Sequence, residues 1–245
     1  MPAAAAPRWT AIVVAGGRAT RLGGIDKTAL VYRGRSLLAG VLGAVTGAER
    51  ICVVGSDAPL PAGVLSAVEE PRWGGPAAAI VAGLRALDSG GAAEGGAARG
   101  DAAWVLVSAA DLVRADEAVT ALLTTLEHLA GSVALGAAQS LTLDGVISVD
   151  ARGHRQPLLA VYRLVALRSA AAAAGDAENL SVKSLIGALN LVEVALPDEL
   201  SADVDTAADA ARLGILLPGA SATPNQSADA DQSLSADPGP SPASG

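Results

Sequence analysis

The sequence predicts an α/β protein with a single doubly wound, mainly parallel sheet. Short apolar runs rich in β-branched residues recur along the chain, and stretches with helical spacing separate most of them. The apolar runs are continuous rather than alternating, as is typical of strands that are buried on both faces. Regular alternation of strands and helices favours a parallel sheet with helices on both of its faces.

The expected elements follow the chain in order, strands where β-branched residues gather and helices where apolar side chains recur at helical spacing. Pro76 suits the first turn of the helix that it begins. Strands are expected at Ala11–Val14, Arg50–Val54, Trp104–Ser108, Ser132–Ala137, Gly145–Val149, Pro157–Tyr162 and Leu191–Leu196. Helices are expected at Ser36–Gly47, Pro76–Leu87, Asp116–Ala130, Leu164–Ala174, Ser181–Leu189 and Thr206–Leu213.

Residues 10–217 are expected to form one domain, after a flexible N-terminus at residues 1–9. Within the domain, Ser89–Ala103 is rich in Gly and Ala and has few large apolar residues, so it is expected to be a mobile loop. Residues 218–245 contain Leu234 as their only large apolar residue, which predicts a disordered tail.

Composition excludes several classes of function. The net charge of −8, with two Tyr, three Trp and no Phe, disfavours a nucleic acid partner. The single cysteine, Cys52, excludes disulfides and a cysteine-built zinc site, and it lies in an apolar run where a thiol behaves as a small buried hydrophobe. No apolar run is long enough to span a membrane and no secretion signal is visible, so we expect a cytoplasmic protein without a membrane partner.

A Gly-rich stretch follows the first expected strand. Gly16 and Gly17 can bring backbone N–H groups close to phosphate oxygens, because no side chains intervene. The stretch does not match the Rossmann fingerprint, because the two glycines are adjacent, nor Walker A, because Lys27 follows Asp26 rather than a glycine. The alternative interpretation is a surface turn with exposed cations.

The stretch is similar to a family signature. Val14–Gly17, Arg21–Gly24 and Asp26–Lys27 resemble the Leu-Ala-Gly-Gly-x-x-x-Arg-Met-Gly-x-Asp-Lys pattern of the MobA-like nucleotidyltransferases. The resemblance implies a fold of the nucleotide-diphospho-sugar transferase type and a nucleotide site. That site would use Val14, Ala15, Gly16, Gly17 and Lys27. Nucleotidyl transfer builds up negative charge on phosphate oxygens. The planar guanidinium of Arg21 would therefore contact two of these oxygens, and the ammonium of Lys27 would act as a point charge.

Two further segments agree with this resemblance. Glu70 and Gly75 lie in a segment similar to the family's acidic residue and Gly-Pro-Leu-Ala motif, which implies contacts with the nucleotide base; the alternative is an ordinary loop and helix start. Asp111 ends an apolar strand where ligands bind in open α/β sheets, and the resemblance implies that it holds Mg²⁺ and is catalytic. Alternatively, Asp111 caps the next helix. Ala110 and Val113 depart from the family's Cys-Asp-x-Pro pattern.

The last motifs concern the metal and the acceptor. Asp203 and Asp205 stand where the family has asparagines, and one of them is expected to give the metal a second oxygen. Gln156 resembles the family's acceptor-binding glutamine, although it can also be a simple strand start. His154 and His128 are expected to be solvated.

The resemblance implies transfer of GMP from GTP to the phosphate of molybdenum-loaded molybdopterin, with release of pyrophosphate, Mg²⁺ as cofactor and transient contact with other molybdenum cofactor proteins. Two alternatives stay open. The chain can be a cytidylyltransferase or another NTP transferase with a different phosphorylated acceptor. It can also be a nucleotide-binding homologue without catalysis, although the presence of Arg21, Lys27 and Asp111 together argues against this.

Overall fold

The computed structural model describes residues 7–16, 27–89, 102–134, 143–175, 177–201, 204 and 207–215. Most of the expected N-terminal segment, residues 90–101 of the expected mobile loop and the whole expected tail lie outside the described residues. Among the described helices, none combines the length and the hydropathy that a membrane crossing requires.

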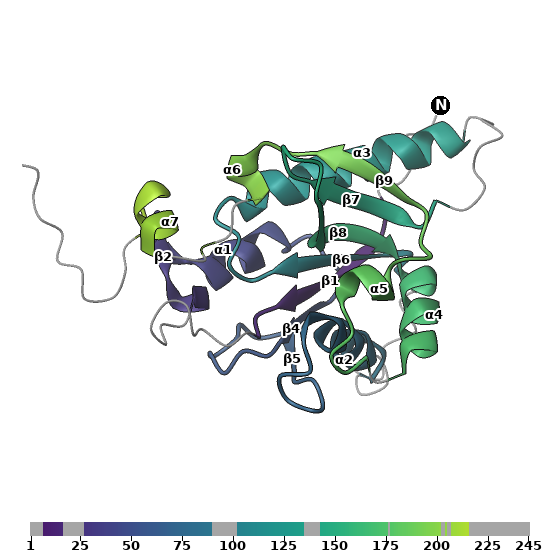
Figure 1. Ribbon diagram of the computed structural model, residues 1–245, viewed down its shortest axis with the longest axis horizontal. Helices are drawn as coiled ribbons and strands as arrows, with labels where there is room; N and C mark the ends of the chain where they lie inside the picture. The colour runs from purple at the N-terminus through teal and green to yellow at the C-terminus, as the bar shows by residue number, and fades with distance from the viewer. Residues whose placement is uncertain are drawn as a thin grey trace, which may run out of the picture.

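A seven-stranded sheet in the order β5-β4-β1-β6-β8-β7-β9 forms the centre of the molecule (Figure 1). Of its strands, β8 alone runs antiparallel to its two neighbours, and all other neighbouring pairs are parallel. The mainly parallel, doubly wound sheet predicted from the sequence is therefore confirmed. The strands are β1 (Trp9–Val14), β4 (Ile51–Val54), β5 (Val64–Ala67), β6 (Trp104–Ala109), β7 (Gly145–Val149), β8 (Arg155–Arg163) and β9 (Leu191–Ala195).

Helices cover both faces of this sheet, and a small hairpin of β2 (Val31–Tyr32) and β3 (Arg35–Ser36) lies beside it (Figure 1). Ser36 also starts the first helix, because its hydroxyl oxygen accepts from the backbone N–H of Ala39 at 3.2 Å. The helices are α1 (Leu37–Ala44), α2 (Pro76–Ser89), α3 (Ala115–Ala134), α4 (Leu164–Ala174), α5 (Val182–Leu185), α6 (Asp198–Ser201) and α7 (Ala207–Arg212), with a 3₁₀ turn η2 at Lys27–Ala29.

Alternate side chains of each central strand enter different cores. In β1, Ile12 and Val14 pack with α2, α4 and α5, whereas Ala11 and Val13 pack with α1 and α3 on the opposite face. All six residues of β1 are buried, which explains the continuous apolar run in the sequence. A third, smaller core joins Leu30, Leu37 and Val113 to the C-terminal segment around Val204.

One expected element is wrong, and one strand of the sheet was missed. The run Ser132–Ala137 was expected to be a strand, but residues 132–134 form the end of α3, and the rest of the run is outside the described residues. A short apolar run is ambiguous between helix and strand, and here the preceding helix simply continues through it. The strand β5 was missed because it has only four residues, contains Ser66 and follows a Pro- and Gly-rich segment.

Candidate active site

The carboxyl ends of four neighbouring parallel strands bring distant parts of the chain to one edge of the sheet. Backbone hydrogen bonds continue past the strand ends: the N–H of Ala15 donates to Val54 O at 2.8 Å, and the N–H of Ala110 donates to Val14 O at 3.0 Å. The N–H of Gly55 donates to Ala67 O at 2.9 Å. The residues that follow β1, β4, β5 and β6 therefore form one continuous rim, where open α/β sheets bind their ligands.

Lys27 and Asp111 meet on this rim. The Lys27 Nζ atom lies 3.9 Å from Asp111 Oδ2, and each side chain is 20% exposed. Asp111 lies in the turn between β6 and α3, several residues before the helix begins at Ala115, so the sequence-based alternative of a helix cap does not apply to it. The pair places one cation and one carboxylate where a ligand on the rim can reach both.

The third core fixes the segments that carry this pair. Leu30, just after Lys27, and Val113, just after Asp111, are both buried in it, 1% and 8% exposed. Val113 replaces the proline of the family pattern, and its side chain supplies part of this contact. Val204 is fully buried in the same cluster, which brings the C-terminal segment against the turn of Asp111.

A buried carboxylate that the sequence did not single out lies beside the Gly-rich segment. Glu69 is 4% exposed, and its Oε1 accepts from the backbone N–H of Trp73 at 3.1 Å. Its Oε2 is buried without a hydrogen-bond partner among the described residues. Glu70, the residue predicted from the sequence to contact the base, is exposed instead. Burial distinguishes these two adjacent glutamates, because Glu69 is enclosed beside the Gly-rich segment and Glu70 is open to solvent.

Glycines allow the rim to close tightly around Glu69. Gly55 has a φ of +80°, and a Cβ on it would lie 2.7 Å from Gly16 Cα and 3.6 Å from Glu69 Oε2. Gly75, at the start of α2, has a φ of +94° and open space where a side chain would be. Gly55 therefore lets its backbone pack directly against that of Gly16, whereas the backbone at Gly75 is open to a ligand in a way that a side chain would prevent.

A groove of about 630 Å³ adjoins this rim between the start of α2, the end of β6, the start of β8 and the segment leading into α5. Gln156 lines it, and its side-chain amide donates to Asp150 Oδ2 at 3.4 Å. The pKa of Asp150 is held below its ordinary value, first by the backbone N–H of His154 and then by that of Arg152. Asp150 thus stays an acceptor that orients the turn before β8 and the Gln156 amide.

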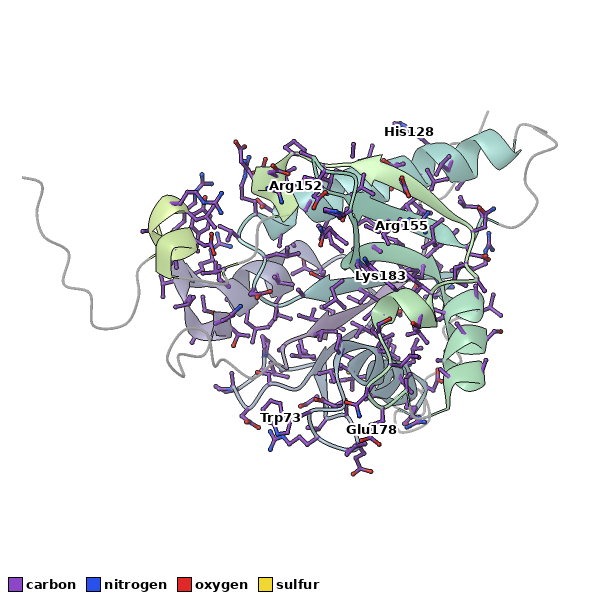
Figure 2. All side chains as sticks on the ribbon, viewed as in Figure 1. Trp73, His128, Arg152, Arg155, Glu178 and Lys183 are labelled. Carbon is purple, nitrogen blue, oxygen red and sulfur yellow. The ribbon has the colours of Figure 1, made fainter. Side chains whose placement is uncertain are left out.

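The remaining predicted residues divide into two groups. Gly17, Arg21, Asp203 and Asp205 lie outside the described residues. His128 is exposed on α3, at the outer surface in Figure 2, and His154 is exposed with its Nδ1 3.2 Å from Asp150 Oδ2. Within the described ranges, no group of three or more His, Cys, Asp or Glu residues could hold a metal.

The rim, the Lys27–Asp111 pair and the fold agree with a match to a family model. The model of the MobA-like NTP transferase domain matches residues 11–192, which is most of the chain. The chain belongs to this family. Membership makes it a nucleotidyltransferase-type protein, as the resemblance of the Gly-rich segment implied. The comparison with curated proteins finds no match to the chain.

Solved structures support the fold. The molybdopterin-guanine dinucleotide biosynthesis protein A from Archaeoglobus fulgidus has 19% identity and a TM-score of 0.54, covering 83% of this chain and 96% of its own. The inositol-1-phosphate CTP transferase from T. maritima has 14% identity and a TM-score of 0.55, covering 83% and 91%. A Mycobacterium tuberculosis protein in complex with manganese has 18% identity and a TM-score of 0.50, covering 84% and 97%. The identities are all below 20%, so the likeness to these structures establishes the fold alone.

Proposed function

We propose that this nucleotidyltransferase transfers GMP from GTP to the phosphate of molybdopterin and releases pyrophosphate. The observation that carries the proposal is the Lys27–Asp111 pair, 3.9 Å apart on the rim next to the Gly-rich segment. An oxygen of the acceptor phosphate attacks the α-phosphorus of GTP in line, the bond to the β-phosphate oxygen breaks, and pyrophosphate leaves with the bond's electron pair.

In this proposal the triphosphate lies along the part of the rim that follows β1. Val14, Ala15 and Gly16 end β1 and begin the loop, where backbone N–H groups can face phosphate oxygens. Lys27 stabilises the charge that builds up on the leaving pyrophosphate, because it is a fixed cation and needs no rearrangement during the reaction. We assign Gly17 and Arg21 to the same phosphates, from the family signature that they complete.

The base contact belongs to Glu69 rather than to Glu70. A buried carboxylate oxygen without a partner is costly unless a ligand donates to it. Guanine offers two donors on one edge, the ring N–H and the exocyclic amino group, and an ionised carboxylate only accepts. Cytosine presents its amino group beside a ring acceptor, so it suits Glu69 less well. The Gly75 backbone, with open space beside it, completes the base site.

The donor set fits a magnesium ion with few protein ligands. Asp111 supplies a hard carboxylate oxygen on the rim, and triphosphate oxygens and water normally complete the coordination of Mg²⁺ in such sites. When bound, the ion neutralises the phosphates that approach Asp111. Asp203 and Asp205, which flank the buried Val204, remain the proposed source of a second carboxylate.

A second candidate keeps the chemistry and changes the substrates. The similar fold of an inositol-1-phosphate CTP transferase favours CTP and another phosphorylated acceptor as the alternative. A homologue that binds nucleotide without turnover is the third candidate. The presence of the Asp111 carboxylate beside Lys27 argues against this candidate, because a protein that only binds nucleotide has little need for a metal-binding carboxylate there.

The test is pyrophosphate release by purified protein with Mg²⁺, comparing GTP, CTP, ATP and UTP with and without molybdenum-loaded molybdopterin. We expect release with GTP only when the pterin is present. A preference for CTP would reject the assignment of Glu69 to guanine. Nucleotide binding without release, with the pterin and with inositol 1-phosphate, would reject the catalytic proposal.

A further inference from the structure

The groove beside the rim has an unusual charge pattern for this chain. Its polar lining consists of Gln156, Asn179, Ser181 and Lys183, and the rest is apolar or glycine. Lys183 is the one cation among the described residues that line it, and none of these residues is acidic. In a chain with a net charge of −8, a lining with one cation and no carboxylate makes this groove a candidate site for an anion.

The backbone of Lys183 is positioned by the elements around it. It is the second residue of α5, which Ser181 begins by accepting from the backbone N–H of Ser184 at 3.0 Å. Figure 2 shows Lys183 beside β8 at the centre of this face, away from the exposed Arg152. The backbone N–H of Asn179 donates to Gly74 O at 2.9 Å, so this wall of the groove is bonded to the loop of the proposed base site.

The groove is also too large for a phosphate alone. Its volume of about 630 Å³ is in the range of sites for drug-sized ligands, and Leu112, Pro157 and Leu158 give it apolar walls. Lys27 and Asp111 do not line it. The reacting centre therefore lies beyond the end formed by Ala109 and Leu112, and Lys183 faces the body of whatever molecule fills the groove.

We propose that Lys183 determines acceptor specificity by pairing with an anionic group that the acceptor carries in addition to its reacting phosphate. The inference rests on the proposed function, because it needs a phosphorylated acceptor in this groove. Lys183 binds this group in the ground state and in the transition state alike. Its removal therefore raises the KM for the acceptor and leaves kcat unchanged.

The experiment compares two probes on the full chain. Molybdenum-loaded molybdopterin has a metal-bearing anionic dithiolate besides its phosphate, whereas inositol 1-phosphate has only the phosphate. Binding of each probe to nucleotide-free protein is measured by calorimetry, and pyrophosphate release gives the KM and kcat. The variants are Lys183→Gln, Lys183→Arg as rescue, and Arg152→Gln as a control cation outside the groove.

We expect Lys183→Gln to weaken molybdopterin binding and raise its KM about tenfold, as for the loss of one charge-assisted hydrogen bond. Lys183→Arg should restore most of the affinity, and Arg152→Gln should behave as the wild type. Binding of inositol 1-phosphate and the KM for GTP should not change. Because Lys183 is exposed, its replacement is expected to leave the thermal midpoint unchanged.

Four results would overturn the inference: unchanged molybdopterin binding in Lys183→Gln, an equal loss for both probes, a fall in kcat without a change in KM, or no molybdopterin binding by the wild type. The proposed function fails separately. If the wild type binds the pterin but releases no pyrophosphate, the enzymatic proposal is rejected, while the calorimetric comparison still decides the role of Lys183.

Discussion

Replacing Gly55 by alanine tests whether the rim is built by close contact between Gly55 and Gly16. A Cβ at position 55 would lie 2.7 Å from Gly16 Cα and 2.9 Å from Gly16 N, and these atoms belong to backbone that cannot rotate away. The φ of +80° adds a second penalty, because an alanine rarely adopts it. Gly63 is the matched control, since its φ is +83° but no atom lies within 4 Å of its added Cβ.

The two penalties can be estimated separately. An alanine in the left-handed backbone conformation costs roughly 1 to 2 kcal/mol. This is the whole decrease in the free energy of unfolding that we expect for Gly63→Ala. Overpacking adds roughly 1 to 3 kcal/mol, so Gly55→Ala should lose about 2 to 5 kcal/mol in total. At about 2 to 4 °C per kcal/mol for a chain of this size, the expected fall in Tm is about 4 to 20 °C for Gly55→Ala.

The assays are urea unfolding, thermal melting and nucleotide kinetics. Gly55→Ala must displace Gly16, so kcat/KM for the nucleotide should fall at least about tenfold, because a misplacement of about 1 Å can cost more than that. Gly63→Ala should keep the wild-type kinetics. Equal stability losses in the two variants, or normal kinetics in Gly55→Ala, would refute the reasoning.

Two other substitutions test the buried side chains of Glu69 and Cys52 through the stability of the protein. Glu69→Gln should raise the free energy of unfolding by about 1 kcal/mol, because it removes a buried carboxylate whose Oε2 has no hydrogen-bond partner among the described residues, and it should raise the KM for GTP about tenfold or more. Glu70→Gln should do neither, and a destabilised Glu69→Gln would contradict the assignment. Burial raises the pKa of the Cys52 thiol to about 11 from an ordinary value near 9. The folded state therefore holds its proton longer than the unfolded state, so this contribution to stability is present below pH 9 and is lost as the pH rises to 11. Urea titrations between pH 9 and 11 should show that the free energy of unfolding depends less on pH in Cys52→Ala than in the wild type. The same dependence on pH in both proteins would reject this role of Cys52.

Much of the fold could be predicted because the central strands and long helices have strong patterns. The run at Ala11–Val14 is apolar throughout because both faces of β1 are covered, and Leu164–Ala174 was predicted with the bounds that α4 has. The edge strand β5 could not be predicted in this way. It has little apolar surface to bury, and its pairing with β4 is a long-range feature.

The site could be predicted only in part, for a different reason. Spacing in one segment predicted a role for Lys27, and position at a strand end predicted one for Asp111, but their contact at 3.9 Å depends on how two distant segments pack through Leu30 and Val113. Glu69 and Lys183 have no signature of their own in the sequence. Glu69 stands out only by its burial, and Lys183 only by the absence of carboxylates from the groove that it lines.

The most direct test of the central claim is to measure pyrophosphate release and GTP binding together in Asp111→Asn. The substitution keeps the size of the side chain and removes the charge beside Lys27. If Asp111 holds the metal for nucleotidyl transfer, release should fall by about 10³, since such an ion contributes several kcal/mol to the transition state, while GTP still binds. Near-normal release by Asp111→Asn would show that the Lys27–Asp111 rim is not the catalytic centre.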